Sequence, residues 1–258
     1  MPSFARRVES FSSTIFSEIN LLAQQYGALN LGQGKPDFGT PPHIVAYLAQ
    51  AALSGQYNQY APGPGTSSLR QAVADHAARF YGMEIDPARG VVVTAGATEG
   101  VFCAVLGLVD AGDEVILIEP SYDSYMPSVV MAGAKPVFVP LHQPDWTFDP
   151  DELRAAFSNR TRALILNTPH NPTGRVFTRE ELSLIAQLCI EHDVVVISDE
   201  VYEHLLYDEA QHVPIATLPG MFERTLTVSS AGKLFSATGW KIGWMYGTPE
   251  MVEGPARV

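Results

Sequence analysis

Short runs rich in β-branched residues recur along the chain, and they constrain its fold more than any other feature. They lie at residues 91–94, 115–118, 136–139, 163–167, 194–198 and 225–228. These runs are apolar throughout rather than alternating, which is typical of parallel strands covered on both faces. Helical patterns separate or precede them at 43–53, 67–79, 98–108, 151–157 and 178–191. The sequence therefore predicts an α/β fold with a doubly wound, mostly parallel sheet between two layers of helices.

Two segments carry more specific boundary signals. Thr178 is followed three residues later by Glu181, which is the capping-box pattern of a helix N-terminus. Segment 242–246 is flanked by glycine and rich in aromatic residues, and the sequence leaves a further strand and a loop both open there.

Composition narrows the class of protein. A chain of 258 residues with 46% hydrophobic and 17% charged residues is large enough to bury roughly 70–75% of its unfolded surface. Its 16 basic and 28 acidic residues give a net charge of −12, and no run of Lys or Arg forms a basic stripe. This balance argues against a nucleic-acid partner.

Other segments bear on location and redox state. No apolar run approaches the ~20 residues of a membrane span, so we expect no membrane partner. Arg6 and Arg7 are not followed by an apolar segment, and we therefore expect no export signal and a cytoplasmic protein. Cys103 and Cys189 lie in apolar, helix-like stretches, which favours buried thiols over a disulfide.

Polar residues follow the predicted strands, at the edge where open α/β sheets bind ligands. Residues 95–100 form a small-residue turn that opens a helix after the first run, and its free backbone N–H groups suit a phosphate, although such turns also serve close packing alone. The turn has neither the G-x-G-x-x-G nor the P-loop spacing. Tyr122 follows the second run, where its ring could stack on a planar ligand or fill the core. Asn171 follows the fourth run, where it could donate a hydrogen bond to a ligand or belong to a structural turn. The sequence leaves both alternatives open for each residue.

The most informative pair is a lysine and a carboxylate. Lys233 lies between small residues, and Asp199 ends the fifth run, where burial without a cationic partner is costly. An amine that captures an aldehyde and an acid that pairs with a pyridine nitrogen are what a pyridoxal phosphate site needs. Glu200, Glu203 and His204 offer a competing metal-binding interpretation, but no second ligand cluster completes it, and we assign no metal.

Seven stretches, in order along the chain, resemble a known family. They are residues 31–38, 58–61, 94–100, 119–123, 167–174, 198–202 and 229–244. Together they are similar to fold type I, pyridoxal-phosphate-dependent aminotransferases of class I/II, on the kynurenine, glutamine and methionine aminotransferase branch. The resemblance implies a seven-stranded large-domain sheet, with residues 1–38 as an N-terminal arm and part of a small domain, and 39–258 as the cofactor-binding large domain.

The resemblance also implies roles at the cofactor ring. Lys233 would form the Schiff base with pyridoxal 5′-phosphate and then move the α-proton of the substrate. Asp199 would pair with the ring nitrogen, Tyr202 and Asn171 would donate hydrogen bonds to the ring's phenolic oxygen, and Tyr122 would stack on the ring.

Further implied roles concern the phosphate, the substrate and a second subunit. The implied phosphate ligands are Ala97, Thr98, Ser230, Lys241 and, from a second subunit, Tyr60. The Tyr60 contact implies a homodimer. Gly34 would place its backbone near the substrate carboxylate, with Asn171 beside it.

Two departures from the family pattern modify these expectations. Lys35 stands where the resembling proteins more often have an apolar residue. The sequence also ends before the small C-terminal domain that supplies an arginine for the substrate's α-carboxylate, and neither Arg175 nor Arg257 matches that arginine. We therefore expect a cofactor site that binds amino acids weakly.

The resemblance implies transfer of an amino group from an L-amino acid of methionine, glutamine, kynurenine or aromatic type to a 2-oxo acid. Two alternatives stay open: a β-lyase that cleaves C–S bonds with the same cofactor, and a non-catalytic remnant that only binds pyridoxal phosphate. Formation of a keto acid would identify the aminotransferase, whereas release of ammonia would identify the β-lyase.

Overall fold

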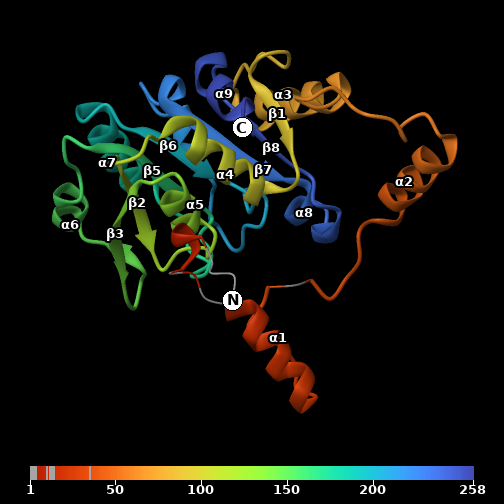
Figure 1. Ribbon diagram of the computed structural model, residues 1–258, viewed down its shortest axis with the longest axis horizontal. Helices are drawn as coiled ribbons and strands as arrows, with labels where there is room; N and C mark the ends of the chain where they lie inside the picture. The colour runs from red at the N-terminus through yellow and green to blue at the C-terminus, as the bar shows by residue number, and fades with distance from the viewer. Residues whose placement is uncertain (1–4, 10, 12–14, 35) are drawn as a thin grey trace.

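The computed structural model describes residues 5–9, 11, 15–34 and 36–258. One sheet of eight strands runs through the described part of the chain, in the order β1-β8-β7-β6-β5-β2-β3-β4 (Figure 1). The strands are β1 (Val91–Thr94), β2 (Glu114–Glu119), β3 (Lys135–His142), β4 (Thr147–Phe148), β5 (Thr161–Asn167), β6 (Val195–Asp199), β7 (Thr225–Ser230) and β8 (Gly243–Tyr246). Neighbours are parallel from β7 to β3, whereas β8 is antiparallel to β1 and β7, and β4 is antiparallel to β3.

Helices connect and cover these strands. They are α1 (Ile15–Tyr26), α2 (Pro42–Ser54), α3 (Ser67–Tyr81), α4 (Ala97–Leu108), α5 (Tyr125–Met131), α6 (Pro150–Ala155), α7 (Arg179–Glu191), α8 (Ala231–Leu234) and α9 (Pro249–Ala256). Short 3-10 helices lie at Arg6–Val8, Ile215–Thr217, Phe222–Arg224 and Thr238–Trp240. Helices α1 and α2 bury no residue. Both stand away from the sheet in Figure 1.

The all-apolar strands have a direct structural cause. Val115 and Leu117 of β2 pack in a core with α4, α5 and α9, while Ile116 and Ile118 of the same strand pack in a second core with α6 and α7. Because successive side chains of a strand point to opposite faces, a strand covered on both faces needs apolar residues at every position. The predicted three-layer α/β fold is confirmed.

Close packing of two helices depends on glycine. A Cβ placed on Gly107 of α4 would overlap the backbone at Gly254 and Pro255 of α9, and one on Gly254 would overlap the Gly107 carbonyl. The two helices therefore approach each other backbone to backbone, and this contact holds α9 against the same sheet face as α4.

The predicted number of strands needs one correction. The sheet has eight strands rather than seven, because the two-residue strand β4 forms a hairpin with β3 and is too short to leave a pattern. The ambiguous segment 242–246 forms strand β8, which pairs on both sides. Thr178 and Glu181 form the predicted capping box of α7.

Two further predictions concern the thiols and the membrane. Cys103 and Cys189 are both buried and free, as the sequence predicts. No helix in the described part of the chain has the length and apolar character needed to cross a membrane.

Candidate functional site

A cavity of about 470 Å³ opens at the carboxyl ends of the parallel strands. Its walls come from the segments after β1, β2, β5, β6 and β7, and from residues 31–34 near α1. Ten of the residues singled out from the sequence line it: Gly34, Ala97, Thr98, Tyr122, Asn171, Asp199, Tyr202, Ser230, Lys233 and Lys241. The strand-end pattern therefore locates the cavity, while the roles of these residues stay predictions.

Asp199 is the last residue of β6 and is only 5% exposed. The Tyr125 hydroxyl donates to its Oδ2 at 2.6 Å, and the Val201 N–H donates to its Oδ1 at 3.2 Å. Burial raises the pKa of Asp199 to about 6, although these two hydrogen bonds act in the opposite direction. Among the described residues no Lys or Arg forms an ion pair with Asp199. The carboxylate thus favours a cationic group in the cavity.

Lys233 lies in the short helix α8, which follows β7 directly. Its Nζ is 5.5 Å from the centroid of the Tyr202 ring. Burial lowers the pKa of Lys233, and the charge of Lys241 lowers it further, whereas Asp199 acts to raise it. A lower pKa increases the fraction of neutral amine, which is the nucleophilic form.

Tyr202 and Asn171 form a hydrogen-bonded pair on the cavity wall. Asn171 Nδ2 donates to the Tyr202 hydroxyl oxygen at 3.4 Å, and the Asn171 N–H donates to Asn167 Oδ1 at 2.7 Å. Asn167 Nδ2 in turn donates to the Asp199 carbonyl at 2.9 Å. Burial raises the pKa of Tyr202 to about 12, and the nearby Asp199 charge adds to this effect. Tyr202 therefore stays protonated at neutral pH and can donate a hydrogen bond.

The start of α4 also lines the cavity. No side chain caps this helix, whose N-cap is Gly96 with φ of 82°. A Cβ on Gly243 of β8 would overlap the Gly96 carbonyl carbon, so strand and turn are in close contact. Uncapped N–H groups at Ala97 and Thr98, next to the Lys241 side chain, attract an anion such as a phosphate.

These parts fit pyridoxal phosphate by their chemistry. The cavity holds an amine that can react with an aldehyde, a buried carboxylate that no described Lys or Arg pairs with, and an uncapped helix N-terminus. Tyr122 adds an aromatic wall beside Tyr125, with ring centroids 5.8 Å apart. The donor set therefore matches the aldehyde, the ring nitrogen and the phosphate of the cofactor.

Several predicted residues lie elsewhere. Tyr60 is fully exposed and does not line the cavity, so its predicted contact needs a second copy of the chain. Lys35 lies outside the described residues. Arg175 pairs with Glu181 and Arg257 with Glu253, and neither lines the cavity.

Among the cavity-wall residues to which the sequence reasoning gave no role, Tyr125 and Asn167 form hydrogen bonds that hold the predicted residues in place. Both act through other residues, since Tyr125 bonds to Asp199 and Asn167 holds the Asn171 loop. Asn167 does have a recognisable signal, because it is a polar residue at the end of an apolar strand. Tyr125 begins α5, and its spacing from β2 gives no sign that its hydroxyl reaches β6.

The chain is similar to known proteins along nearly all of its length. The family "Aminotransferase class I and II" matches residues 26–258. A probable N-succinyldiaminopimelate aminotransferase of Mycobacterium tuberculosis is 52% identical over 251 residues, which cover 96% of this chain and 63% of that protein. Human kynurenine–oxoglutarate transaminase 1 is 48% identical over 262 residues, covering 96% of this chain and 62% of the relative. The chain thus spans less than two thirds of the length of these relatives.

Solved structures agree with the sequence matches. The N-succinyldiaminopimelate aminotransferase of Mycobacterium tuberculosis superposes with a TM-score of 0.94 at 50% identity, covering 99% of this chain and 67% of that one. YbdL of Escherichia coli, described as having a methionine aminotransferase function, superposes with a TM-score of 0.94 at 39% identity, covering 100% and 67%. By the extent of the family match and the identity of its relatives, this chain belongs to the class I and II aminotransferase family.

Proposed function

We propose that the chain forms the pyridoxal-phosphate-binding part of an aminotransferase, which moves an amino group from an L-amino acid to a 2-oxo acid. The observation that carries this proposal is the presence in one cavity of the Lys233 amine and the buried Asp199 carboxylate, which forms no ion pair with any described Lys or Arg. Relatives named as aminotransferases support the same reaction class. Burial lowers the pKa of Lys233, which increases the fraction of neutral amine that can attack an aldehyde.

When bound, pyridoxal phosphate supplies an aldehyde that reacts with amines and a ring that accepts electrons. Lys233 Nζ then has two tasks: to hold the cofactor and, once released, to move a proton at the α-carbon of the substrate. Asp199 keeps the ring nitrogen protonated, because a carboxylate buried without a cation binds such an N–H strongly. Tyr202 and Asn171 hold the ring oxygen, and the Tyr122 ring packs on the ring face.

The remaining residues position the two charged ends. Ala97, Thr98, Ser230 and Lys241 bind the phosphate through backbone N–H groups, a hydroxyl and a cation. The Gly34 backbone, which also lines the cavity, takes the substrate carboxylate together with Asn171.

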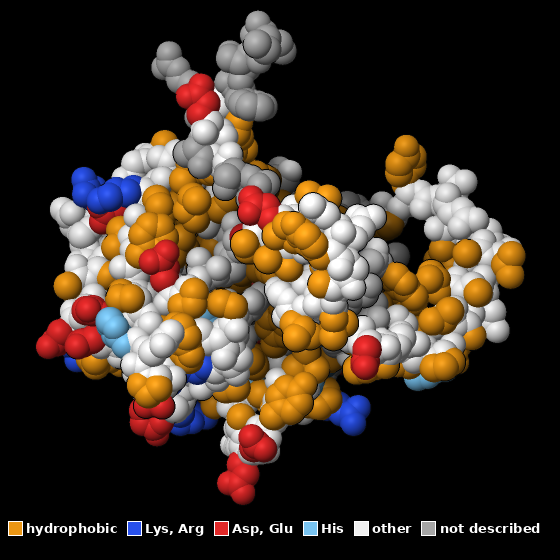
Figure 2. Space-filling model, turned by 90° about the horizontal axis from the view of Figure 1, so that it is seen from below, with side chains coloured by type: hydrophobic (Ala, Val, Ile, Leu, Met, Phe, Trp, Pro, Cys, Tyr) orange, Lys and Arg blue, Asp and Glu red, His pale blue; other side chains and the backbone are white. Residues whose placement is uncertain are grey.

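A homodimer is part of the proposal. Large apolar side chains are exposed on α1 and α2 and in the segment after α2, among them Leu21, Tyr47, Leu53 and Tyr60. Figure 2 shows orange side chains along the arm on the right, which is the α2 region of Figure 1. Exposed apolar surface of this extent marks an interface. A second copy that covers it would bring Tyr60 to the neighbouring cavity; sedimentation of a monomer at micromolar concentration would contradict this.

The division into domains and the cellular location belong to the same proposal. We assign residues 1–38 to an N-terminal arm and part of a small domain, and residues 39–258 to the cofactor-binding domain. Limited proteolysis that cuts first near residue 38 and leaves a cofactor-binding core supports this division. A cytoplasmic location remains a prediction.

Covalent trapping tests the cofactor site. We expect pyridoxal phosphate to give a visible absorption band with the protein, and borohydride reduction to add the cofactor mass to the peptide that contains Lys233. Lys233→Ala removes both signals. Lys135→Ala is the matched control, since Lys135 lies on β3 and pairs with Glu114 away from the cavity. Labelling of another lysine with full occupancy in the Lys233→Ala protein would refute the assignment.

Product analysis tests the reaction. The amino donors to compare are L-methionine, L-kynurenine and N-succinyldiaminopimelate, because similar proteins are named as aminotransferases of these compounds. The acceptor is 2-oxoglutarate. Formation of a 2-oxo acid with glutamate identifies an aminotransferase. Ammonia and pyruvate from a cysteine conjugate identify a β-lyase, and a trapped cofactor without turnover identifies a binding protein.

A further inference from the structure

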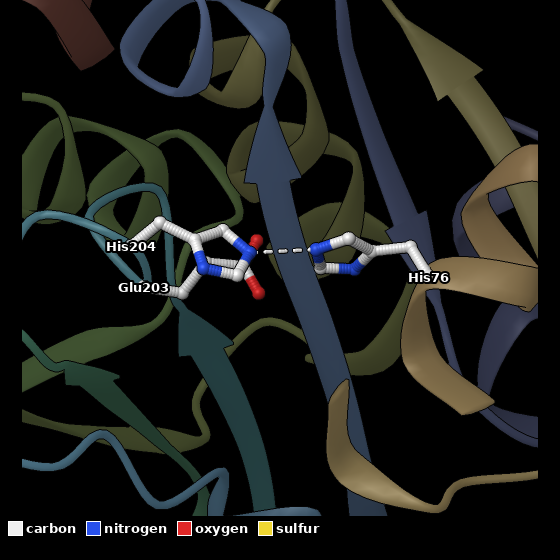
Figure 3. Close-up of side chains that lie close together, drawn as sticks. All are labelled: His76, Glu203 and His204. Carbon is white, nitrogen blue, oxygen red and sulfur yellow. Dashed lines mark hydrogen bonds between the residues drawn. The ribbon is translucent and has the colours of Figure 1, made fainter. Parts of the chain in front are cut away.

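A second cluster of chemically reactive side chains lies outside the cavity. His76 on α3 and His204 in the turn after β6 point their imidazoles at each other, with Nε2 atoms 2.7 Å apart (Figure 3). The carboxylate of Glu203 lies beside them, and one ligand atom from each of the three residues falls within 4.8 Å of the others. None of the three lines the cofactor cavity.

The donor atoms are those of a transition-metal site. Two imidazole nitrogens and a carboxylate oxygen suit Zn²⁺ and its neighbours Co²⁺, Ni²⁺ and Cu²⁺. Tetrahedral Zn²⁺ with ligands at about 2.0–2.1 Å places ligand atoms about 3.3 Å apart. The two nitrogens are therefore slightly too close, and small rotations of the exposed His204 side chain correct this. Exposure of His204 also leaves room for water as a fourth ligand.

The charge at Glu203 favours a cation there. Its carboxylate is only 3% exposed, and in the described part of the chain no Lys or Arg forms an ion pair with it. The other buried acid of this turn, Glu200, already has a partner in His212, whose Nε2 is 2.8 Å from its Oε2. A carboxylate buried without a cation is costly, and a metal held by two histidines supplies the missing charge.

Neighbouring groups hold the ligands in place. The Tyr81 hydroxyl donates to Glu203 Oε2 at 2.6 Å, and the Ser229 hydroxyl donates to Oε1 at 2.7 Å. Each carboxylate oxygen keeps a second lone pair for a metal. The Phe80 ring packs against both imidazoles, with centroids 4.8 Å from His76 and 4.7 Å from His204. Such outer contacts orient metal ligands in known sites.

We propose that His76, Glu203 and His204 form a binding site for a divalent transition metal ion, with Zn²⁺ as the natural probe. The ion links α3 to the turn after β6, two segments that lie 128 residues apart at His76 and His204. It is a structural site. It stabilises the turn that carries Asp199 and Tyr202 without entering the cavity, and it does not depend on the proposed reaction.

Metal titration of the full chain tests the proposal, with and without added pyridoxal phosphate. After dialysis against a chelator, equilibrium dialysis with Zn²⁺ should show one ion per chain, and Co²⁺ should give the visible bands of a tetrahedral site. His204→Ala and His76→Ala should abolish both signals. Tyr81→Phe, which removes one contact to the carboxylate, should weaken Zn²⁺ binding by about 10–100-fold.

Thermal stability provides a second readout. Zn²⁺ should raise the melting temperature of the unaltered chain and leave that of His204→Ala unchanged. His142→Ala is the matched control, because His142 is also a half-exposed histidine next to a glutamate, Glu152, but lies on β3. If His76→Ala does not fold, the exposed His204 variant decides. Binding of Zn²⁺ by His204→Ala as tightly as by the unaltered chain, or failure of the unaltered chain to bind, overturns the proposal.

Discussion

Asp199→Asn should stabilise the cofactor-free protein at neutral pH while it weakens cofactor binding. The structure gives the magnitude, because burial raises the pKa of Asp199 from its ordinary 3.8 to about 6. That difference corresponds to about 3 kcal/mol of folding free energy. Asparagine has nearly the same shape as aspartate and carries no charge, so it avoids the burial of a carboxylate ion.

The pH dependence follows from linkage. Asp199 binds its proton more tightly in the folded than in the unfolded chain. Its contribution to stability is therefore fully present below pH 3.8 and is lost as the pH rises through about 6. The difference in free energy of unfolding between Asp199→Asn and the unaltered chain should be near zero at about pH 4 and approach about 3 kcal/mol at about pH 8.

Urea unfolding of cofactor-free protein across this range measures the difference. Subtraction removes the contributions of other groups that titrate there, such as His212. Asp75→Asn on α3 is the matched control for loss of one carboxylate, since Asp75 is exposed and bonds to Gln71. If Asp199→Asn is less stable than the unaltered chain at about pH 8, or if the difference does not change with pH, the reasoning from burial is wrong.

Three other substitutions test the site and the core. Tyr125→Phe removes a hydrogen bond to Asp199 and should raise the pKa of that carboxyl further, so retention of pyridoxal phosphate on dialysis should fall and recover only at higher pH. Leu164→Ala, in the centre of buried β5, should lower the free energy of unfolding in urea by about 2–5 kcal/mol. Gly243→Ala should displace the turn before α4 and weaken pyridoxal phosphate binding in a fluorescence titration, whereas Gly239→Ala, where a Cβ meets nothing, should not.

The central strands were predictable because a single physical requirement, burial of both faces, determines their residues. Strands covered on both faces must be apolar at every position, and this pattern survives in the sequence without knowledge of their partners. Strand β4 has only two residues and exists because β3 offers it hydrogen bonds. Segment 242–246 was ambiguous for a similar reason, since β1, one of the two strands it pairs with, is remote in sequence.

The candidate site was predictable where residues follow strands. Parallel strands bring their carboxyl ends to one edge, so Asp199, Asn171 and Tyr122 meet although they lie far apart in sequence. Tyr125 escaped notice because its hydroxyl acts on another side chain. His76 escaped for a different reason: it lies on a helix in a polar pattern, and its partners His204 and Glu203 are more than a hundred residues away.

Three buried carboxylates lie at the end of β6 and in the turn that follows it: Asp199, Glu200 and Glu203. The way each is compensated separates what the fold provides from what ligands provide. Glu200 has His212 as a protein partner. Within the described part of the chain, Asp199 accepts hydrogen bonds from a tyrosine hydroxyl and a backbone N–H, and Glu203 accepts them from two hydroxyls beside the facing histidine pair; neither forms an ion pair with Lys or Arg there. A group that binds the folded state alone stabilises it in proportion to the logarithm of its concentration. Pyridoxal phosphate at Asp199 and a metal ion at Glu203 are therefore expected to stabilise the same segment from two sides, at carboxylates that form no ion pair with Lys or Arg among the described residues.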